Sequence, residues 1–294
     1  MKSRRLLSLL LLRVLLLAFL AAACSDSDPL TDRARSGDAE AQLALARRLV
    51  EEGRDGAGPG EAVEWYRAAA EQGAVEAQYE LALLLSVSAE GPSAQGLSPE
   101  GESQEAQSAP GDAELAEAAR WYEAAAEQGH SESQRVLISI YDDGVGVEAD
   151  AGVALRWLAA LAEWGEAVDQ FALAERHVEG RGGSKNYGRA AKLFRAAAEQ
   201  GHVEAQFHLG RAYLSHGLGV LLDVDEAIVW LSLAADAGHV EAQNLLGILY
   251  ATGRGIPAEP AEAIRWFSMA GEQGHHNAQT NLAILYRDGL GVDV

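Results

Sequence analysis

The sequence contains one cysteine and only three lysines in 294 residues, and these scarcities limit what the protein can do. The lone cysteine, Cys24, excludes a disulfide within the chain. The 23 basic residues are outnumbered by 44 acidic ones, which gives a formal net charge of −21. So acidic a chain argues against binding nucleic acid or anionic lipid headgroups through its folded part. It favours basic partners or divalent cations, or simply aids solubility.

The motifs of common catalytic and metal sites are also missing. The sequence has no Cys-x-x-Cys or His-Glu-x-x-His, the usual signatures of zinc sites. No Gly-Lys-Ser/Thr follows its paired glycines, as a phosphate-binding loop would require. It lacks Ser-x-x-Lys, the nucleophile arrangement of penicillin-recognising enzymes. We therefore expect no catalytic residue, no metal and no cofactor.

What the sequence does contain is a repeat. Seven glycines keep one register, at spacings of 36, 56, 36, 36, 37 and 36 residues. These register glycines are Gly37, Gly73, Gly129, Gly165, Gly201, Gly238 and Gly274. A glutamine follows each one by five residues and a leucine by eight, and a large apolar residue precedes the last six by eight. A fixed period of about 20–50 residues is typical of stacked repeat proteins.

Each unit has the pattern of two short helices joined by a glycine-rich turn. Apolar residues recur at spacings of four in the segment from Glu241 to Tyr250, which is a helical period. Turn glycines such as Gly253 and Gly255 tolerate positive φ and end the first helix, and the register glycine ends the second. Alanines three residues before each large apolar residue let two helix axes approach closely. One large ring per unit, the tryptophan in most units, is expected to fill the gap between layers.

Other recurring residues favour structural roles. Four histidines directly follow a register glycine, one per unit, which predicts a place at the start of a first helix instead of a shared metal site. They are His130, His202, His239 and His275. The seven register glutamines are expected to bond neighbouring backbone, because a catalytic group is needed once and these recur in every unit.

The segments RWYEAAAEQGHSESQ from Arg120 and LFRAAAEQGHVEAQFHLGRAYLSHGLGV from Leu193 resemble Sel1-like repeats, a variant of the tetratricopeptide helical hairpin. The resemblance covers about residues 37–294, with minor departures at Leu193, Asp169 and His177. It implies an all-α fold, a right-handed α-solenoid of about six to seven antiparallel helix-pair repeats of 36 residues. It also implies a role as an adaptor or protein–protein interaction scaffold.

The alternative function is an enzyme that binds or hydrolyses β-lactams, as described for cysteine-rich secreted members of that family. The present chain lacks their paired cysteines.

The 56-residue spacing is one unit plus an insertion of 20 residues. The stretch 86–111 is rich in Ser, Gly, Pro, Glu and Gln, and it cannot bury enough apolar surface to order itself. We therefore expect a disordered insertion at 86–111 that is dispensable for folding.

Residues 1–23 have the pattern of a secretory signal: basic residues, a short apolar run and then small residues. Arg13 interrupts the apolar stretch, which argues against a spanning helix. Cys24 after the run Leu-Ala-Ala-Ala resembles the lipobox of bacterial lipoproteins, which implies acylation and a linker over 24–36. We expect a lipid-anchored protein on the periplasmic side of the envelope, with Ser25 favouring the outer membrane. Cleavage that leaves a free thiol is the alternative.

The first helices carry variable positions two before, two after and five after the register glutamine, opposite the residues that pack inward. Variation over a constant scaffold is typical of a ligand-reading face, and equally of an unconstrained solvated face. In related solenoids the first helices line the concave side, so we expect a protein partner there. The candidate residues are Glu76, Glu80, Ser139, Glu175, His208 and Arg211.

The last unit has its first helix, from about His275 to Arg287, while its partner helix would lie beyond Val294. An open end of a repeat array exposes an apolar layer. Two expectations follow: the open C-terminal end is a docking point for a partner or for self-association, or the last helix caps the array with its turn folded back. In either case Leu282 and Tyr286 should pack on the preceding helix.

Overall fold

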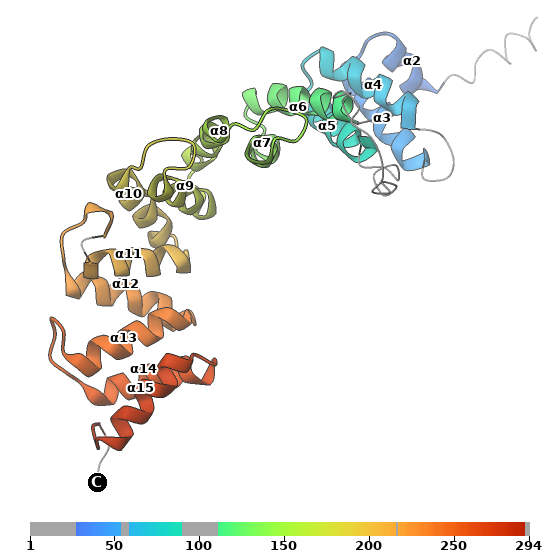
Figure 1. Cartoon of the computed structure of the whole chain (residues 1–294). Helices are drawn as coiled ribbons and strands as arrows, with labels where there is room; N and C mark the ends of the chain where they lie inside the picture. The colour runs from blue at the N-terminus through green and yellow to red at the C-terminus, as the bar shows by residue number, and fades with distance from the viewer. Residues whose placement is uncertain (1–27, 54–58, 90–110, 216, 292–294) are drawn as a thin grey trace, which may run out of the picture. The chain divides into compact units, whose positions relative to one another are not determined.

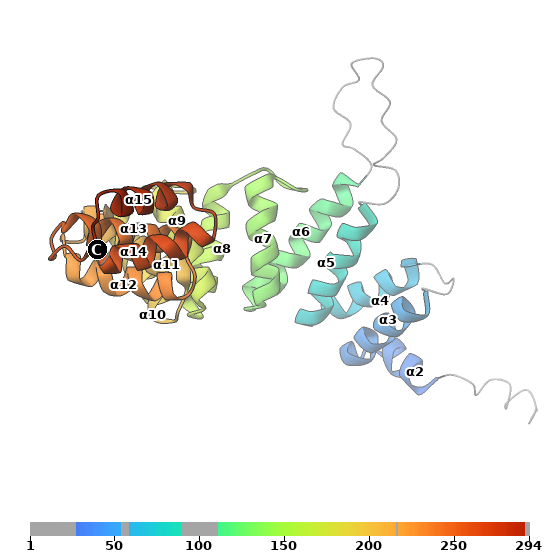
Figure 2. The same cartoon turned by 90° about the horizontal axis from the view of Figure 1, so that it is seen from below.

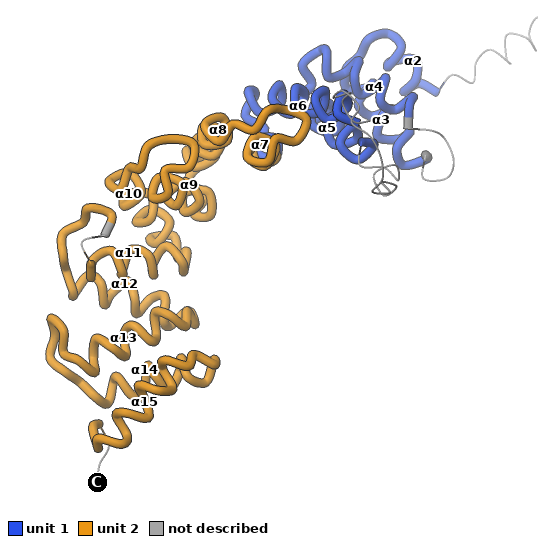
Figure 3. Tube along the Cα trace, in the orientation of Figure 1, with its two compact units in different colours: residues 1–133 blue, residues 134–294 orange. Residues whose placement is uncertain are grey.

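The structure is a computed structural model that describes residues 28–53, 59–89, 111–215 and 217–291. These residues form fourteen α-helices and one short 3-10 helix, and none of them forms a strand. The sequence-based prediction of an all-α solenoid of helix-pair repeats is confirmed. The chain divides into two compact units, residues 1–133 and 134–294, each described by itself (Figure 3). The signal segment and Cys24 lie outside the described residues.

Unit 1 is built from helices that pack on their neighbours in the chain. Its helices are α2 (Pro29–Arg35), α3 (Ala39–Gly53), α4 (Pro59–Glu71), α5 (Val75–Ala89) and α6 (Asp112–Glu127), with the beginning of α7 (Ser131–Asp143). Helix α3 packs on α4, and α5 packs on α6 along its length (Figures 1 and 2).

Unit 2 repeats the same arrangement. Its helices are the rest of α7, α8 (Ala151–Glu163), α9 (Ala167–Glu179), α10 (Tyr187–Glu199), α11 (Val203–Ser215), η2 (Gly217–Gly219), α12 (Val224–Asp236), α13 (Val240–Thr252), α14 (Pro260–Glu272) and α15 (His276–Arg287). Helix α9 packs on α10, α11 on α12, and α13 on α14.

The register glycines end the second helices, as predicted. All seven have positive φ, between 86° and 92°, a backbone conformation that costs a side-chain-bearing residue steric strain. In the turn after Gly201, His202 then starts the next helix within two residues. This short connection keeps successive helices antiparallel and sets the repeat length.

The alanine stripe packs the helix pairs closely, also as predicted. The alanines three before each large apolar position are at most 1% exposed, and they are Ala62, Ala118, Ala154, Ala190, Ala227 and Ala263. The register leucines from Leu45 to Leu246 are buried, and Leu282 is partly buried.

Two tryptophans at the predicted position, Trp230 and Trp266, are buried as predicted, but in the other units the most deeply buried large side chain is one residue later. Trp65, Trp121 and Trp157 are only partly buried, and the next residue in each unit is more deeply buried. Those deeply buried residues are Tyr66, Tyr122, Leu158, Phe194, Leu231 and Phe267. The indole of Trp121 instead lies near the surface and donates a hydrogen bond to Glu117, 3.2 Å away. The size of tryptophan predicts burial, but its polar N–H favours a position beside a surface carboxylate.

The register glutamines join successive helices, which confirms their predicted structural role. Gln243 is 1% exposed, and its amide Nε2 donates to the carbonyl of Ala235 at 3.0 Å. The side-chain amide of Gln273, at the end of the same unit, donates to Gln243 Oε1 at 2.8 Å. Corresponding links run from Gln42 to Ala34, Gln78 to Ala70, Gln206 to Ala198, Gln72 to Gln42, Gln128 to Gln78 and Gln200 to Gln170.

Two predicted boundaries differ from the structure. The segment 24–36, expected to be a linker, contains α2, which buries Ala34 and supplies the carbonyl that Gln42 binds. Residues 86–89, expected to begin the insertion, continue α5, and the hydroxyls of Ser86 and Ser88 bond the carbonyls four residues earlier. The remainder of the insertion, residues 90–110, lies outside the described residues.

The C-terminal helix packs on α14 through Leu282, as predicted, but its buried large side chain is Leu285 and not Tyr286. Leu285 is 5% exposed and lies in a cluster with Phe267, whereas Tyr286 is half-exposed. Ile284 and Leu290 are also exposed.

Candidate functional site

The six candidate residues do not form one face, but three of them meet in a groove. Glu175, His208 and Arg211 line the same depression in unit 2. Ser139 lines a different groove of that unit, and Glu76 and Glu80 belong to unit 1. We call the depression around Glu175, His208 and Arg211 the α9–α11 groove.

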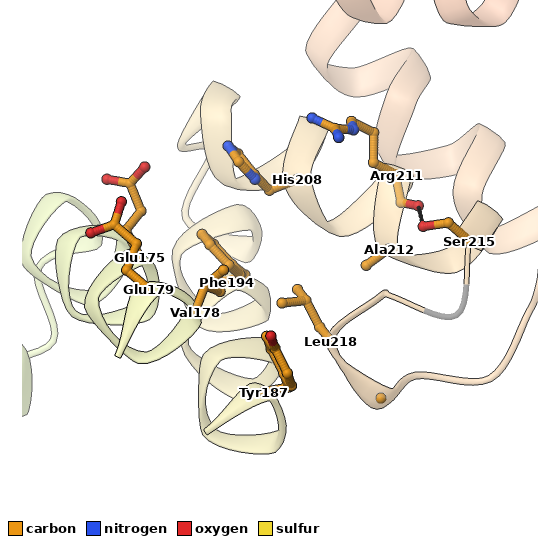
Figure 4. Close-up of a pocket in the computed structure, with 11 residues that line it drawn as sticks. Glu175, Val178, Glu179, Tyr187, Phe194, His208, Arg211, Ala212, Ser215 and Leu218 are labelled. Carbon is orange, nitrogen blue, oxygen red and sulfur yellow. Dashed lines mark hydrogen bonds between the residues drawn. The ribbon is translucent and has the colours of Figure 1, made fainter. Parts of the chain in front are cut away.

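The α9–α11 groove has a volume of about 550 Å³ and is open to solvent. Figure 4 shows two carboxylates of α9 on one side, His208 and Arg211 of α11 on another, and apolar side chains between them. The apolar part consists of Val178, Phe194, Leu218 and the ring of Tyr187. A concave surface with an apolar floor and a few polar groups around it is the usual form of a binding site.

The acidic side of the groove carries negative charge without a compensating cation. Glu175 lies one turn before Glu179 on α9, and both line the groove. Burial raises the pKa of the Glu175 carboxyl, and the nearby carboxylates of Glu179 and Glu204 raise it further. Within the described part of the chain, no arginine, lysine or histidine lies within ion-pair distance of Glu175 or Glu179. This wall therefore favours a cationic group from outside.

His208 stands on the other side as a neutral ring. It stacks on Phe194 with the ring centroids 5.2 Å apart and the planes 4° apart, and its edge meets Phe171 at 5.8 Å. Burial against these rings lowers the pKa of His208, and the positive charge of Arg211 lowers it further. At neutral pH the imidazole is therefore uncharged and can both donate and accept a hydrogen bond.

Arg211 is exposed next to His208. Its guanidinium carbon lies 5.3 Å from the centroid of the Phe207 ring, a cation–π contact that holds the side chain against the helix. In the described ranges no carboxylate lies within 4.0 Å of this guanidinium. Its hydrogen-bond donors are thus available to an anionic group.

Leu218 reaches the groove from a strained turn. It is the non-glycine residue with positive φ in the described structure, with φ 56° and ψ 15° inside η2. The 37-residue unit carries its extra residue between Tyr213 and Gly217. In four other units a glycine takes a left-handed conformation just after the first helix, namely Gly144, Gly180, Gly253 and Gly289. In the 37-residue unit Leu218 takes a left-handed conformation, and its side chain lines the groove.

Leu218, Val178, Glu179 and Tyr187 were not predicted from the sequence. The prediction considered only one side of the first helices, and these residues lie elsewhere. The irregular spacing at the 37-residue unit was a visible signal for Leu218, because an insertion in one unit of an array often changes its surface loop.

A second groove in unit 2, of about 440 Å³, is lined by Ser139 and contains charges that are already paired. Both Arg176 and Arg181 contact Asp142, which is nearly buried, and Arg176 makes two hydrogen bonds with it. Ser139 donates to Asp143 at 3.1 Å. These groups stabilise the packing of α7 on α9 and leave little for a ligand.

The two candidates in unit 1 have different surroundings. Glu80 accepts hydrogen bonds from the guanidinium of Arg47 on α3, with Nε of Arg47 2.9 Å from Oε1. Its carboxylate therefore joins two neighbouring units of the array. Glu76 is exposed at the start of α5.

The histidines after the register glycines start the first helices, as predicted. Nδ1 of His239 accepts a hydrogen bond from the backbone N–H of Ala242 at 3.1 Å, and His275 does the same with Ala278. Nε2 of His239 lies 3.2 Å from Glu204, so the ring also contacts the preceding unit. In the described ranges no three His, Cys, Asp or Glu side chains are close enough together to hold a metal ion. No helix there is both long and apolar enough to span a membrane.

The sequence was compared with known protein families. A family profile with the description Sel1 repeat matches residues 39–73, 109–130, 139–163, 167–202, 203–239, 240–275 and 276–294. Together these segments make up more than half of the chain. No curated protein matched it.

Two solved structures are similar to this chain. The first is c5321, described as a protective antigen present in uropathogenic Escherichia coli strains and displaying an SLR fold, with 28% identity and a TM-score of 0.61. The match covers 88% of this chain and 51% of c5321, so this chain spans about half of that protein's length. The second is a Sel1 repeat protein from Oxalobacter formigenes, with 32% identity and a TM-score of 0.53, covering 62% of this chain and 77% of that one.

Proposed function

Because the chain belongs to the Sel1 repeat family, we propose that it is a non-catalytic envelope scaffold that holds a protein partner in the α9–α11 groove. Members of this family are helical scaffolds that generally serve protein interaction. The observation that supports this location is the unmatched charge of the groove. Glu175, Glu179 and Arg211 have no ion-pair partner among the described residues, whereas the charges of the second groove are paired with one another.

The partner binding can be tested by a pull-down from envelope extracts with the full chain, comparing wild type with a Glu175→Gln, Glu179→Gln, Arg211→Gln triple variant. We expect at least one protein to be retained by wild type and lost from the variant. The matched control exchanges Glu199, Glu272 and Arg254, which are exposed and do not line the groove. If the control and the groove variant retain the same proteins, the groove is not the binding site.

We further propose that the protein is anchored to the envelope membrane by acylation of Cys24, facing the periplasm, with the outer membrane favoured. The support is the signal-like segment 1–23 and its small residues directly before the cysteine. An anchor with more than one acyl chain binds a bilayer stably, since each buried methylene contributes about 0.8 kcal/mol.

The anchor predicts that Cys24→Ala moves the protein from the membrane fraction to the soluble periplasmic fraction of the native bacterium. Metabolic labelling with a clickable fatty acid should tag wild type and leave Cys24→Ala untagged. A wild type that fractionates as soluble protein, or that takes up no label, would contradict the anchor.

A further inference from the structure

We propose that the α9–α11 groove recognises a peptide segment in which an apolar side chain lies between a lysine or arginine and a carboxylate. This inference rests on the proposed scaffold function and adds the chemistry of the partner. Three parts of the groove each select one part of that segment.

The α9 wall selects the cation. Glu175 and Glu179 are one helical turn apart and both line the groove, and the field of Glu204 reaches the same place. Removing Glu175 from water disfavours its charged form unless a positive group comes close. An ammonium or guanidinium that enters between the two carboxylates supplies that positive group and gains charge-assisted hydrogen bonds.

The floor selects the apolar side chain. Val178 and Leu218 are partly buried and line the groove, and Phe194 lies beneath them at 1% exposure. Leu218 holds its position at the expense of a left-handed backbone, which a glycine would adopt without strain. Strain of this kind persists where the surrounding structure or a function requires the side chain. A ligand side chain placed here would cover Leu218 and the half-exposed ring of Tyr187.

The α11 wall selects the anion. Arg211 offers a planar fork of donors that matches a carboxylate, and it has no carboxylate neighbour among the described residues. Neutral His208 next to it can bond a peptide amide. The two walls thus carry opposite charge, and a segment with one charge of each sign is complementary to both.

The occupant is a segment of another protein. The insertion at residues 90–110 contains no lysine or arginine, so it cannot supply the cation for the α9 wall. A volume of about 550 Å³ lies within the range of about 300–1,000 Å³ seen for ligand sites. Because the groove is open to solvent and has charges at opposite sides, a chain that runs across it satisfies both walls, whereas a small molecule would remain largely exposed.

The test is fluorescence anisotropy with four labelled pentapeptides and the full chain in detergent. Their central residues are Lys-Phe-Asp, Asp-Phe-Asp, Lys-Phe-Lys and Lys-Gly-Asp. We expect Lys-Phe-Asp to bind about twofold to fivefold more tightly than each of the others, since a partly exposed charge pair contributes up to about fivefold.

Three variants and one control identify the groove. Glu175→Gln with Glu179→Gln should remove the preference for Lys-Phe-Asp over Asp-Phe-Asp, and Arg211→Gln should remove the preference over Lys-Phe-Lys. Leu218→Gly should remove the preference over Lys-Gly-Asp while the protein still folds, because glycine relieves the positive φ and this offsets part of the packing lost with the side chain. The double variant Glu199→Gln with Glu272→Gln loses the same charge elsewhere and should bind as wild type does.

The proposed ligand class is wrong if wild type binds the four peptides equally, or if the groove variants keep the wild-type preferences. It is also wrong if free phenylalanine competes as well as the unlabelled Lys-Phe-Asp peptide. A pull-down partner that depends on the groove, together with no peptide preference, would overturn this inference and leave the scaffold function standing. If neither a groove-dependent pull-down partner nor a peptide preference is found, the scaffold function is overturned as well.

Discussion

The histidines that start the first helices act as helix N-caps. An N-cap side chain accepts a hydrogen bond from one of the backbone N–H groups that the first turn leaves unpaired. Nδ1 of His202, His239 and His275 takes this role, and Asp38 does the same in the first unit. Because Nδ1 accepts, the proton of the neutral ring is on Nε2, where it can be donated to a glutamate of the preceding unit.

Replacing the capping histidine predicts a clear order of stability. His239→Ala loses the cap of α13 and should cost about 1 kcal/mol, which lowers the melting temperature by about 2–4 °C in a protein of this size. His239→Asn keeps an acceptor at the same place and should retain most of the stability. Differential scanning calorimetry at neutral pH measures both. Equal losses in the two variants would show that the contact with Glu204 and not the cap is important.

Replacing Glu175 is expected to stabilise the protein, in contrast to replacing His239, and to do so in a pH-dependent way. Its pKa is raised in the folded state by burial and then by Glu179 and Glu204, so the folded protein binds a proton there more tightly than the unfolded chain. Its charge therefore destabilises the fold increasingly as pH rises above about 4.5. Glu175→Gln should raise the melting temperature at pH 7. It should have little effect at pH 4, where the wild-type carboxyl is mostly protonated and, like the amide of the variant, carries no charge. Glu199→Gln is the exposed control, and an effect of the same size at both pH values would contradict this origin.

Two helices of unit 2 contain a glycine where their partner helix comes closest. A Cβ at Gly210 would lie 2.7 Å from Cγ of Leu231, and one at Gly247 would lie 2.6 Å from the ring of Phe267. Both glycines stand nine residues after a register glycine, on a first helix that faces the large buried residue of its partner. The absence of a methyl group there is what lets this residue fill the layer.

Gly247→Ala tests this packing against helix propensity. Alanine is a better helix former than glycine by about 1 kcal/mol, yet the new methyl overlaps a buried ring and should cost about 1–3 kcal/mol. We expect net destabilisation in urea unfolding. Gly188→Ala is the matched control, because Gly188 is exposed on α10 and a Cβ there would meet only Asn186 Oδ1 at an ordinary contact distance of 3.9 Å, and it should be neutral or stabilising. A stabilised Gly247→Ala would mean that the layer can shift to accept the methyl.

The ends of the inserted segment meet in unit 1. A Cβ at Gly111 would lie 3.2 Å from the carbonyl oxygen of Ala89, so the chain leaves and re-enters the helix pair at nearly the same point. Helices α5 and α6 pack on each other along their length beside this point. The pair therefore does not need residues 90–110 to position it.

Replacing residues 90–110 by a short Gly-Ser link should change the melting temperature by less than about 4 °C, since the closure entropy of a loop grows slowly with its length. Thermal unfolding of the shortened chain checks this. A larger loss would mean that the segment contributes packing of its own. The composition of the segment, rich in Ser, Gly and Pro, argues against that contribution.

The helices could be predicted from the sequence because the recurring residues each have one structural role within the repeat. Gly201 is needed for positive φ, and Gln206 for bonding across a buried helix end. Trp121 was misplaced because size alone does not distinguish a buried ring from one that keeps its N–H at the surface. Helix α2 was missed because the register begins at Gly37, after it.

The binding site was harder to predict because it depends on contacts between units. Glu80 stands two residues after its register glutamine and Glu175 five after its own, so both belong to the variable face of a first helix, yet their surroundings differ. Glu80 meets Arg47, whereas Glu175 meets two further carboxylates. Helical position alone cannot separate these cases, and the positive φ of Leu218 is visible only in three dimensions.

The whole molecule is strongly charged, and this predicts how salt affects it. With a net charge of −21, its carboxylates repel one another, and this repulsion opposes the folded state. Exposed ion pairs such as Arg67 with Glu117 contribute only about 0–1 kcal/mol each. Between about 0.01 and 0.15 M NaCl the screening length falls from about 30 to about 8 Å. The melting temperature should therefore rise over this range. A fall would show that the ion pairs outweigh the net repulsion.

The glutamine links also affect how such an array can change over generations. Five register glutamines donate backward to a carbonyl of the preceding second helix, as Gln243 does to Ala235 and Gln279 does to Gly271. An in-frame duplication of one unit therefore carries a donor for the junction before it and an acceptor for the junction after it. Loss of one unit rejoins the same two groups. Gene segments of about 36 codons can thus be gained or lost at such junctions while each donor keeps an acceptor.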